Sequence, residues 1–99
     1  MAPFSLIMPF FTYILQSETT GRYYCGSTGD LNRRVKQHND PEYHGSMTTK
    51  RFKGPWKITW FKEFPSRSEA MFLEKKIKKR GIKRYLDDRH QAESRRRRD

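Results

Sequence analysis

The chain has little of what marks disulfide-rich, zinc-binding and membrane-spanning proteins. Cys25 is the only cysteine among 99 residues, which excludes an internal disulfide framework and a thiolate zinc site. A reducing intracellular compartment, the cytoplasm, is therefore expected. No apolar run approaches the roughly 18 residues of a membrane span. The apolar stretch near the start is interrupted by Thr12 and two prolines, and no basic segment precedes it, so it does not resemble a signal peptide.

Acidic residues are also scarce relative to basic ones. Asp and Glu number 11 and Lys and Arg number 22, so the net charge is +11 and the sequence pI is about 10.2. Such an excess points to a polyanionic partner. Nucleic acid is the first candidate and an anionic membrane surface the second, while the plainest alternative is a soluble basic protein without such a partner. Hydrophobic residues make up only 33%, which predicts one small domain with a thin core.

The composition shifts along the chain and suggests three parts. Residues 1–9 contain two prolines and are expected to form a leader. Residues 10–92 are expected to form a single domain, and residues 93–99, with four consecutive arginines, a disordered basic tail. Within the domain, residues 40–55 are polar and basic and are predicted to form a mobile connecting loop. Thr48, Thr49 and Lys50 of this loop are either contacts to a substrate backbone or simply solvated.

Alternating aromatic and aliphatic residues predict strands. The first two are joined by a turn at residues 17–21 and should form a hairpin, which would place Tyr13 and Tyr24 on adjacent strands. In the third, period-two spacing predicts that Trp56, Ile58 and Trp60 share one face. The expected strands are residues 10–16, 22–27 and 56–64.

Capping residues predict where the helices begin and end. Asp30 is a candidate N-cap, Ser66 with Glu69 forms a capping box, and Gly81 is a C-terminal stop. The expected helices are residues 31–39, a longer one that ends near residue 80, and a short one over residues 82–90.

Polar side chains lie close to the apolar face of two of these helices. Arg34 and His38 are four residues apart, so both project from one face near the core. Glu74 lies at the edge of an apolar stripe, where a carboxylate costs desolvation energy unless it is paired. Its partner would be a metal ion or Arg34, and a structural Arg34–Glu74 salt bridge is the simpler interpretation. His38 alone would be a packed histidine, and Tyr13 and Tyr24 alone would be core aromatics.

Four segments in this order resemble the motifs of the GIY-YIG nuclease superfamily, and most closely its small stand-alone group called UPF0213 or YhbQ-like. The UvrC N-terminal nuclease domain and the Slx1 nucleases belong to the same superfamily. Residues 11–13, Phe-Thr-Tyr, occupy the position where the family has Gly-Ile-Tyr. Residues 24–26, Tyr-Cys-Gly, occupy the position where it has Tyr-Ile-Gly. Residues 30–39 are similar to Asp-Leu-x-x-Arg-x-x-x-His-Asn, and residues 68–74 to Ser-Glu-Ala-x-x-x-Glu. The resemblance spans about residues 10–88.

The resemblance implies an α/β (α+β) fold in which a small three-stranded antiparallel sheet is flanked by helices. It implies that Tyr24 or Tyr13 activates the attacking water and that Arg34 holds the scissile phosphate. It further implies that Glu74 ligates one Mg²⁺ or Mn²⁺ ion and that His38 is a second acid–base group. Tyrosine is a weak base at its usual pKa of about 10, so a neighbouring cation, His38 or Arg34, would have to lower that pKa.

The sequence departs from the family pattern at a few positions. The first motif lacks its Gly and Ile, Cys25 replaces the central Ile of the second, and Ser27 stands where UvrC-like members carry Lys. All the side chains that the family's chemistry needs are nevertheless present. The basic residues expected to bind nucleic acid lie around the motifs: Arg33, Arg34, Lys36, Lys50, Lys75 and Lys78.

The resemblance favours a metal-dependent endonuclease that cuts DNA, with structured or damaged DNA in repair or recombination as its expected substrate. The alternative is a non-catalytic nucleic-acid-binding module, and a ribosome-associated basic protein is a third interpretation. Glu74 discriminates between the first two, because a carboxylate facing a phosphate backbone would weaken simple binding. A monomer is expected, with a protein partner as the means of adding specificity.

Overall fold

The computed structural model describes residues 8–43, 45, 49 and 51–96, with side chains as far as residue 92. Within this part, none of the helices has the length and hydropathy of a membrane span. The elements, in chain order, are β1 (Phe10–Ser17), β2 (Tyr23–Thr28), α1 (Leu31–Asn39), β3 (Trp56–Phe64), α3 (Arg67–Arg80) and α4 (Ile82–Arg96).

The strands form one antiparallel sheet in the order β2-β1-β3, so the first strand lies in the middle. Ile14 at its centre pairs with Cys25 of β2 on one side and with Trp60 of β3 on the other. The hairpin and the third strand lie within a residue or so of their predicted bounds. The predicted fold, a three-stranded antiparallel sheet flanked by helices, is therefore confirmed.

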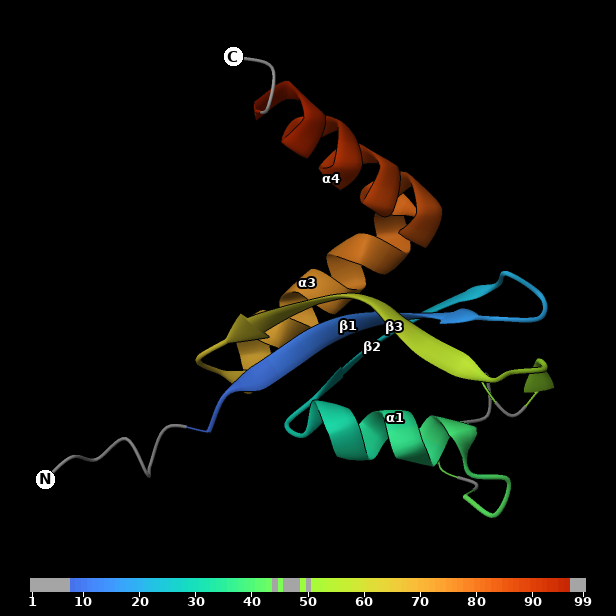
Figure 1. Cartoon of the computed structure of the whole chain (residues 1–99). Coiled ribbons are helices and arrows are strands. Elements are labelled where there is room, and N and C mark those ends of the chain that lie inside the picture. The colour runs from blue at the N-terminus through green and yellow to red at the C-terminus, as the bar shows by residue number, and fades with distance from the viewer. Residues whose placement is uncertain (1–7, 44, 46–48, 50, 97–99) are drawn as a thin grey trace, which may run out of the picture.

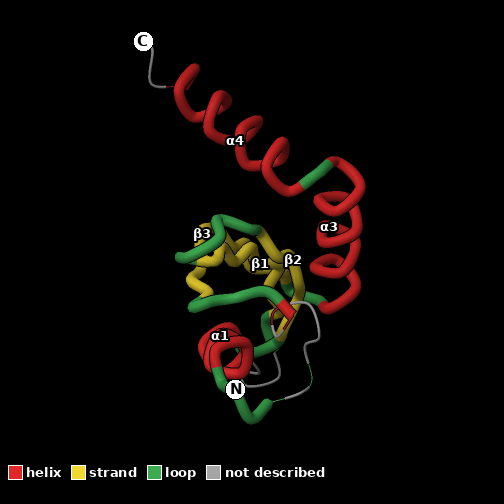
Figure 2. The backbone as a smooth tube through the Cα atoms, turned by 90° about the vertical axis from the view of Figure 1, so that its right-hand side faces the viewer, coloured by secondary structure: helices red, strands yellow, loops and turns green. Residues whose placement is uncertain are grey.

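The helices α1 and α3 cover opposite faces of the sheet, and α4 leads away from it (Figures 1 and 2). Because successive side chains of a strand point to opposite faces, β1 contributes to two cores. Tyr13 and Leu15 pack toward α1, whereas Ile14 packs toward Ile77 of α3. Thr12 also faces α3, where its hydroxyl donates to the backbone oxygen of Ala70 at 2.7 Å. Both faces of the central strand are thus buried.

The third strand contains an irregularity that the sequence pattern did not reveal. Ile14 pairs with Trp60 and Leu15 with Ile58, so Thr59 is an extra residue between two consecutive pairs. A bulge of this kind shifts the following side chains to the other face. Trp60 accordingly packs in the α3-side core against Tyr85 of α4, with ring centroids 5.2 Å apart. The prediction that Trp56, Ile58 and Trp60 share one face is wrong, because strict period-two counting holds only without a bulge.

The predicted helix caps are confirmed. The Asp30 side chain accepts from the backbone N–H of Arg33 at 3.1 Å, and Ser66 accepts from that of Glu69 at 3.3 Å. Gly81 ends α3 with a φ of 103°, a left-handed value that favours glycine. The last helix was predicted to end at residue 90 but continues to Arg96, so residues 93–96 are helical, although the sequence placed them in a disordered tail. Residues 1–7 of the predicted leader and 97–99 of the predicted tail lie outside the described residues.

The described part of the 40–55 connection is anchored to the fold. The side-chain amide of Asn39, at the end of α1, accepts from the backbone N–H of Trp56 at 2.7 Å and donates to its carbonyl at 2.8 Å. The Trp56 indole N–H donates to the carbonyl of Thr49 at 3.1 Å. Thr49 is 3% exposed, so it is a core residue and neither a solvated one nor a contact to substrate. Thr48 and Lys50, the other predicted contacts in this loop, lie outside the described residues.

Candidate active site at the β2 edge

Tyr13 lies at the centre of the α1-side face and has 1% of its surface exposed. Its cross-strand partner is Gly26. A Cβ atom on Gly26 would lie 2.7 Å from the Tyr13 hydroxyl oxygen, closer than carbon and oxygen atoms can approach without a shift. The glycine of the second motif is therefore needed because the ring of the first motif's tyrosine lies across it.

The Tyr13 hydroxyl begins a buried chain of hydrogen bonds. It bonds Nε2 of His38 at 2.8 Å, and Nδ1 of His38 bonds the Thr49 hydroxyl at 2.8 Å. The Tyr13 hydroxyl also interacts with Arg34 of the same helix as His38. His38 is 2% exposed, so this chain holds side chains in place from inside the core.

The two motif tyrosines occupy different environments. Burial raises the pKa of Tyr13 above its usual range, and the neighbouring Tyr24 adds to this, while the hydrogen bond to Arg34 opposes it. Tyr13 therefore stays a neutral phenol. Tyr24 lies on the edge strand and is only partly buried, with its ring 4.9 Å from that of His38. Among the described residues, none hydrogen-bonds the Tyr24 hydroxyl, and Tyr24 is less enclosed than Tyr13.

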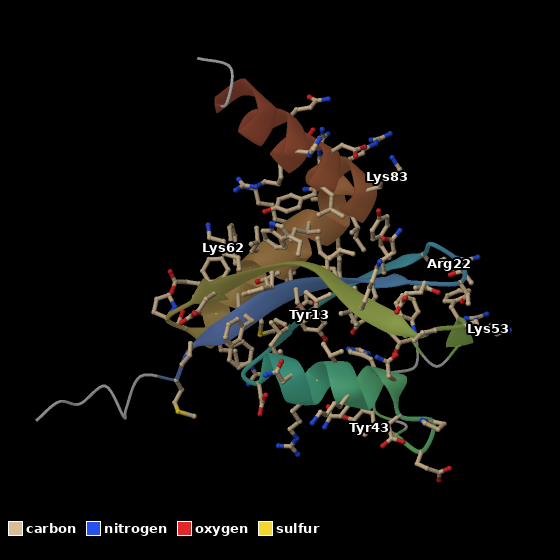
Figure 3. The ribbon with its side chains drawn as sticks, viewed as in Figure 1. Tyr13, Arg22, Tyr43, Lys53, Lys62 and Lys83 are labelled. Atoms are coloured by element: carbon tan, nitrogen blue, oxygen red, sulfur yellow. The ribbon has the colours of Figure 1, made fainter. Side chains whose placement is uncertain are left out.

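Arg34 projects from α1 and is held from several sides. Its Nη1 donates to the Gln37 side chain at 2.9 Å and to the Tyr43 hydroxyl at 3.1 Å. Burial alone would lower the pKa of Arg34, but the hydrogen bonds to Tyr13 and Tyr43 outweigh it and raise that pKa. Figure 3 shows Tyr13 on the central strand and Tyr43 in the segment after α1. The guanidinium is thus a fixed, permanently charged group, and it opens on a surface hollow of about 440 Å³ that Arg33 also lines.

Glu74 reaches the same edge of the sheet from α3. Its Oε1 accepts from the Ser27 hydroxyl of β2 at 2.7 Å, and its Oε2 accepts from Nζ of Lys78 at 2.6 Å. The simpler interpretation from the sequence, an Arg34–Glu74 salt bridge, is wrong, because the helices that carry the two residues lie on opposite faces of the sheet and each side chain has nearer partners. Glu74 nevertheless interacts electrostatically with Tyr13, and Lys78 interacts electrostatically with Tyr24.

Glu74 is the candidate metal ligand, and the chemistry around it fits one ion type. Among the described residues, no group of three or more His, Cys, Asp or Glu side chains could hold a metal. The side chain of Glu74 is 18% exposed, so one carboxylate is accessible to solvent. Mg²⁺ commonly binds through one or two carboxylates while keeping several waters and substrate oxygens. The residues present therefore fit Mg²⁺ or Mn²⁺ and do not form a closed structural site.

The structure brings together part of the set expected from the sequence. Tyr13, Tyr24, Arg34 and His38 cluster on the α1 face of β1 and β2, and Glu74 lies across the edge strand from them. Arg33, Lys36 and Lys75 are exposed, whereas Lys78 is paired with Glu74. Lys50, the remaining predicted nucleic-acid contact, lies outside the described residues.

The sequence analysis missed several residues that position the site. Tyr43 and Gln37 hold Arg34, Ser27 holds Glu74, and Thr49 holds His38. Gln37 lies three residues after Arg34 on a helix, a spacing that brings side chains together and that would have signalled the contact. The other three act over long sequence separations or from an irregular loop, where local spacing carries no signal.

Comparisons with known proteins agree with this geometry. The family model described as the GIY-YIG catalytic domain matches residues 9–96. The structure-specific endonuclease subunit SLX1 of Meyerozyma guilliermondii is 39% identical over 92 residues, which cover 87% of this chain and 31% of SLX1. The UPF0213 protein BH0048 of Halalkalibacterium halodurans is 37% identical over 71 residues, which cover 72% of this chain and 71% of the relative.

A solved structure is also similar. The solution NMR structure of the UPF0213 protein BH0048 from Bacillus halodurans is 32% identical, with a TM-score of 0.48 and 81% of each chain covered. The chain spans less than a third of the length of the SLX1 relatives that it matches. It spans most of the length of the UPF0213 relatives.

Proposed function

The chain belongs to the GIY-YIG catalytic domain family and to its UPF0213 group, and on that premise we propose that it is a metal-dependent endonuclease that hydrolyses phosphodiester bonds in DNA. The observation that carries the proposal is the arrangement around β2, where a phenol of the strand itself is flanked by a fixed guanidinium from α1 and a partly accessible carboxylate from α3. These are Tyr24, Arg34 and Glu74.

Tyr24 is the proposed general base. Tyr24 is only partly buried and lies on the edge strand, whereas the raised pKa and burial of Tyr13 argue against Tyr13 in this role. A general base must reach the water it deprotonates. Lys78 lies near enough for its charge to interact with Tyr24. Tyr24 thus takes the proton of the attacking water.

Arg34 is the proposed phosphate-binding residue. Its planar guanidinium matches a phosphate geometrically and stays charged at every working pH. Because Tyr13, Gln37 and Tyr43 fix its orientation, little reorganisation accompanies the build-up of negative charge on the phosphate. Preorganised donors of this kind are usually the largest single contribution to catalysis. Tyr13 and His38 are positioning residues in this scheme, since neither is exposed to substrate.

Glu74 is the proposed ligand for Mg²⁺ or Mn²⁺. When bound, such an ion supplies positive charge to the scissile phosphate and to the leaving oxygen. Ser27 orients the carboxylate by donating to Oε1. The exposed cations that flank the site would follow the phosphate backbone on either side, with the excess positive charge of the chain as the long-range attraction. They are Arg33, Lys36, Lys75 and Lys78, with Lys50 as a further proposed contact.

The substrate and setting follow from the relatives by analogy. SLX1 proteins are named as subunits of structure-specific endonucleases. We extend to this chain a structured or damaged DNA substrate, as in repair or recombination, and a protein partner that adds specificity to a monomeric domain. A cytoplasmic location is part of the same proposal.

A cleavage assay with Glu74→Ala tests the proposed function. Wild-type protein is incubated with Mg²⁺ or Mn²⁺ and with duplex, nicked, forked and single-stranded DNA. We expect metal-dependent cutting that the variant loses, with DNA affinity unchanged or raised because a negative charge has been removed. Glu69→Ala on the first turn of the same helix is the matched control. If neither protein cuts and both bind tightly in a salt-sensitive manner, the chain is a non-catalytic nucleic-acid-binding module.

A further inference from the structure

The proposed metal ligand has both of its oxygens engaged by protein donors. Oε1 of Glu74 accepts from Ser27, and Oε2 accepts from Lys78 at 2.6 Å. Glu74 and Lys78 are four residues apart on α3, with side chains 18% and 50% exposed. Hydrogen bonding to Glu74 overcomes the effect of burial and raises the pKa of Lys78. The ammonium therefore stands at Oε2, on a side chain that is partly accessible to solvent.

We propose that Lys78 exchanges partners during binding. In the free protein it neutralises Glu74, and it moves to a phosphate of the substrate when Glu74 takes up the divalent cation. DNA and metal then bind cooperatively through one lysine. This inference rests on the proposed function, because it assumes that Glu74 is a metal ligand and that the polyanion is DNA.

Electrostatics require the exchange. An ammonium and a divalent cation on the same carboxylate repel each other strongly at such short range, so Lys78 must withdraw before the metal can bind well. Ser27 need not move, because a hydroxyl is uncharged and Oε1 keeps a further lone pair. Of the two partners of Glu74, only Lys78 therefore acts as a competitor.

The structure also indicates where the released lysine goes. Lysine carries its charge on a flexible four-carbon stem. Because the side chain of Lys78 is half exposed, it has room to change rotamer once it leaves Glu74. The charges of Lys78 and Tyr24 interact across the edge strand, so the released ammonium stays beside the proposed base. The scissile phosphate must lie there for water activated by Tyr24 to attack it. Lys78 thereby binds phosphate only when both the divalent cation and DNA occupy the site.

The exchange makes the coupling reciprocal. If DNA draws Lys78 away from Glu74, it raises metal affinity, and metal must raise DNA affinity by the same factor. Without Lys78, Glu74 is always available, so metal binds more tightly in the absence of DNA and the cooperativity falls. Lys76 provides the matched control, because it is an exposed lysine on the same helix that has no ion pair to Glu74 and is not among the proposed DNA contacts.

The test measures binding and not cleavage. Mn²⁺ affinity is measured by electron paramagnetic resonance, with and without a phosphorothioate duplex that resists hydrolysis, for wild type, Lys78→Gln, Lys78→Arg and Lys76→Gln. We expect DNA to raise the Mn²⁺ affinity of wild type about fivefold or more, at the lower end of typical couplings. Lys78→Gln should bind Mn²⁺ about threefold more tightly without DNA and lose most of the coupling. Lys76→Gln and Lys78→Arg should keep the coupling.

Equal coupling in wild type and Lys78→Gln overturns the exchange while leaving the proposed nuclease intact. Equal loss of coupling in Lys76→Gln and Lys78→Gln also overturns it, because the effect would then reflect net charge alone. Failure of wild type to bind Mn²⁺, with Glu74→Gln no different, overturns both the exchange and the metal-dependent function. Circular dichroism of each variant verifies the fold, and Lys78→Arg separates the loss of the cation from any change in helix packing.

Discussion

Replacing each motif tyrosine by phenylalanine separates the two roles that we propose. Both substitutions remove one hydroxyl and keep the ring, so packing is matched. At Tyr13 the lost hydroxyl is buried and bonded to His38. At Tyr24, which is only partly buried, the lost hydroxyl makes no hydrogen bond within the described residues.

The stability cost follows from burial. Removing a partner from a buried polar group costs about 1–3 kcal/mol, so we expect Tyr13→Phe to lower the free energy of unfolding by that amount. For a chain of this length, each kcal/mol corresponds to a fall in Tm of roughly 4–8 °C. Tyr24→Phe should stay within about 0.5 kcal/mol of wild type, as surface changes usually do. Urea and thermal unfolding followed by circular dichroism measure both differences.

Activity should show the opposite order. Loss of a general base typically lowers the rate by 10²- to 10⁴-fold, which we expect for Tyr24→Phe under single-turnover conditions at a temperature where both variants are folded. Tyr13→Phe should stay within about tenfold of wild type, because it only loosens Arg34. A stable Tyr13→Phe protein that does not cut, beside a Tyr24→Phe protein that does, would refute the assignment of the base.

Two further outcomes follow from the packing around the same strands. Gly26→Ala should lower the free energy of unfolding by about 1–3 kcal/mol, measured in urea, because the new Cβ meets the Tyr13 hydroxyl at 2.7 Å; an unchanged midpoint would show that the ring moves freely. Cys25 is 1% exposed, and burial raises the pKa of its thiol from 9.0 to about 12. Its contribution to stability is therefore complete below pH 9 and is lost as the pH rises toward 12, by an amount of order 4 kcal/mol. Cys25→Ala should flatten that loss, and alkylation of native wild type by iodoacetamide should proceed only through unfolding.

Local sequence signals were sufficient where the structure is locally determined. Asp30 and Ser66 cap their helices through hydrogen bonds to residues three positions later, a contact that spacing encodes. The positive φ of Gly81 likewise reflects a property of one residue. Arg34 and His38 were placed on one helix face by counting alone, and the structure bears that out.

The local sequence signals failed where the tertiary structure decides which residues are in contact. The bulge at Thr59 moves Trp60 to the other face, and nothing in the alternation of the strand marks it. The sequence analysis named a metal ion or Arg34 as the partner of Glu74, and the placement of α1 and α3 on opposite faces excludes Arg34. Glu74 instead pairs with Lys78, four residues later on the same helix, a spacing that would have signalled the contact.

The order of the strands in the sheet underlies our choice of Tyr24, and not Tyr13, as the proposed general base. The hairpin predicted from the sequence fixes only that β1 and β2 are neighbours, and after the 40–55 connection β3 could pair with either. Because β3 pairs with β1, Tyr13 lies on a strand covered on both edges and both faces, and its phenol is sealed in the core. Tyr24 is left on the outer strand and is only partly buried, as the proposed base requires. Had β3 added beside β2, the sheet would have buried Tyr24 and exposed Tyr13. The family's motifs would read the same in that case, and the two chemical roles would be exchanged.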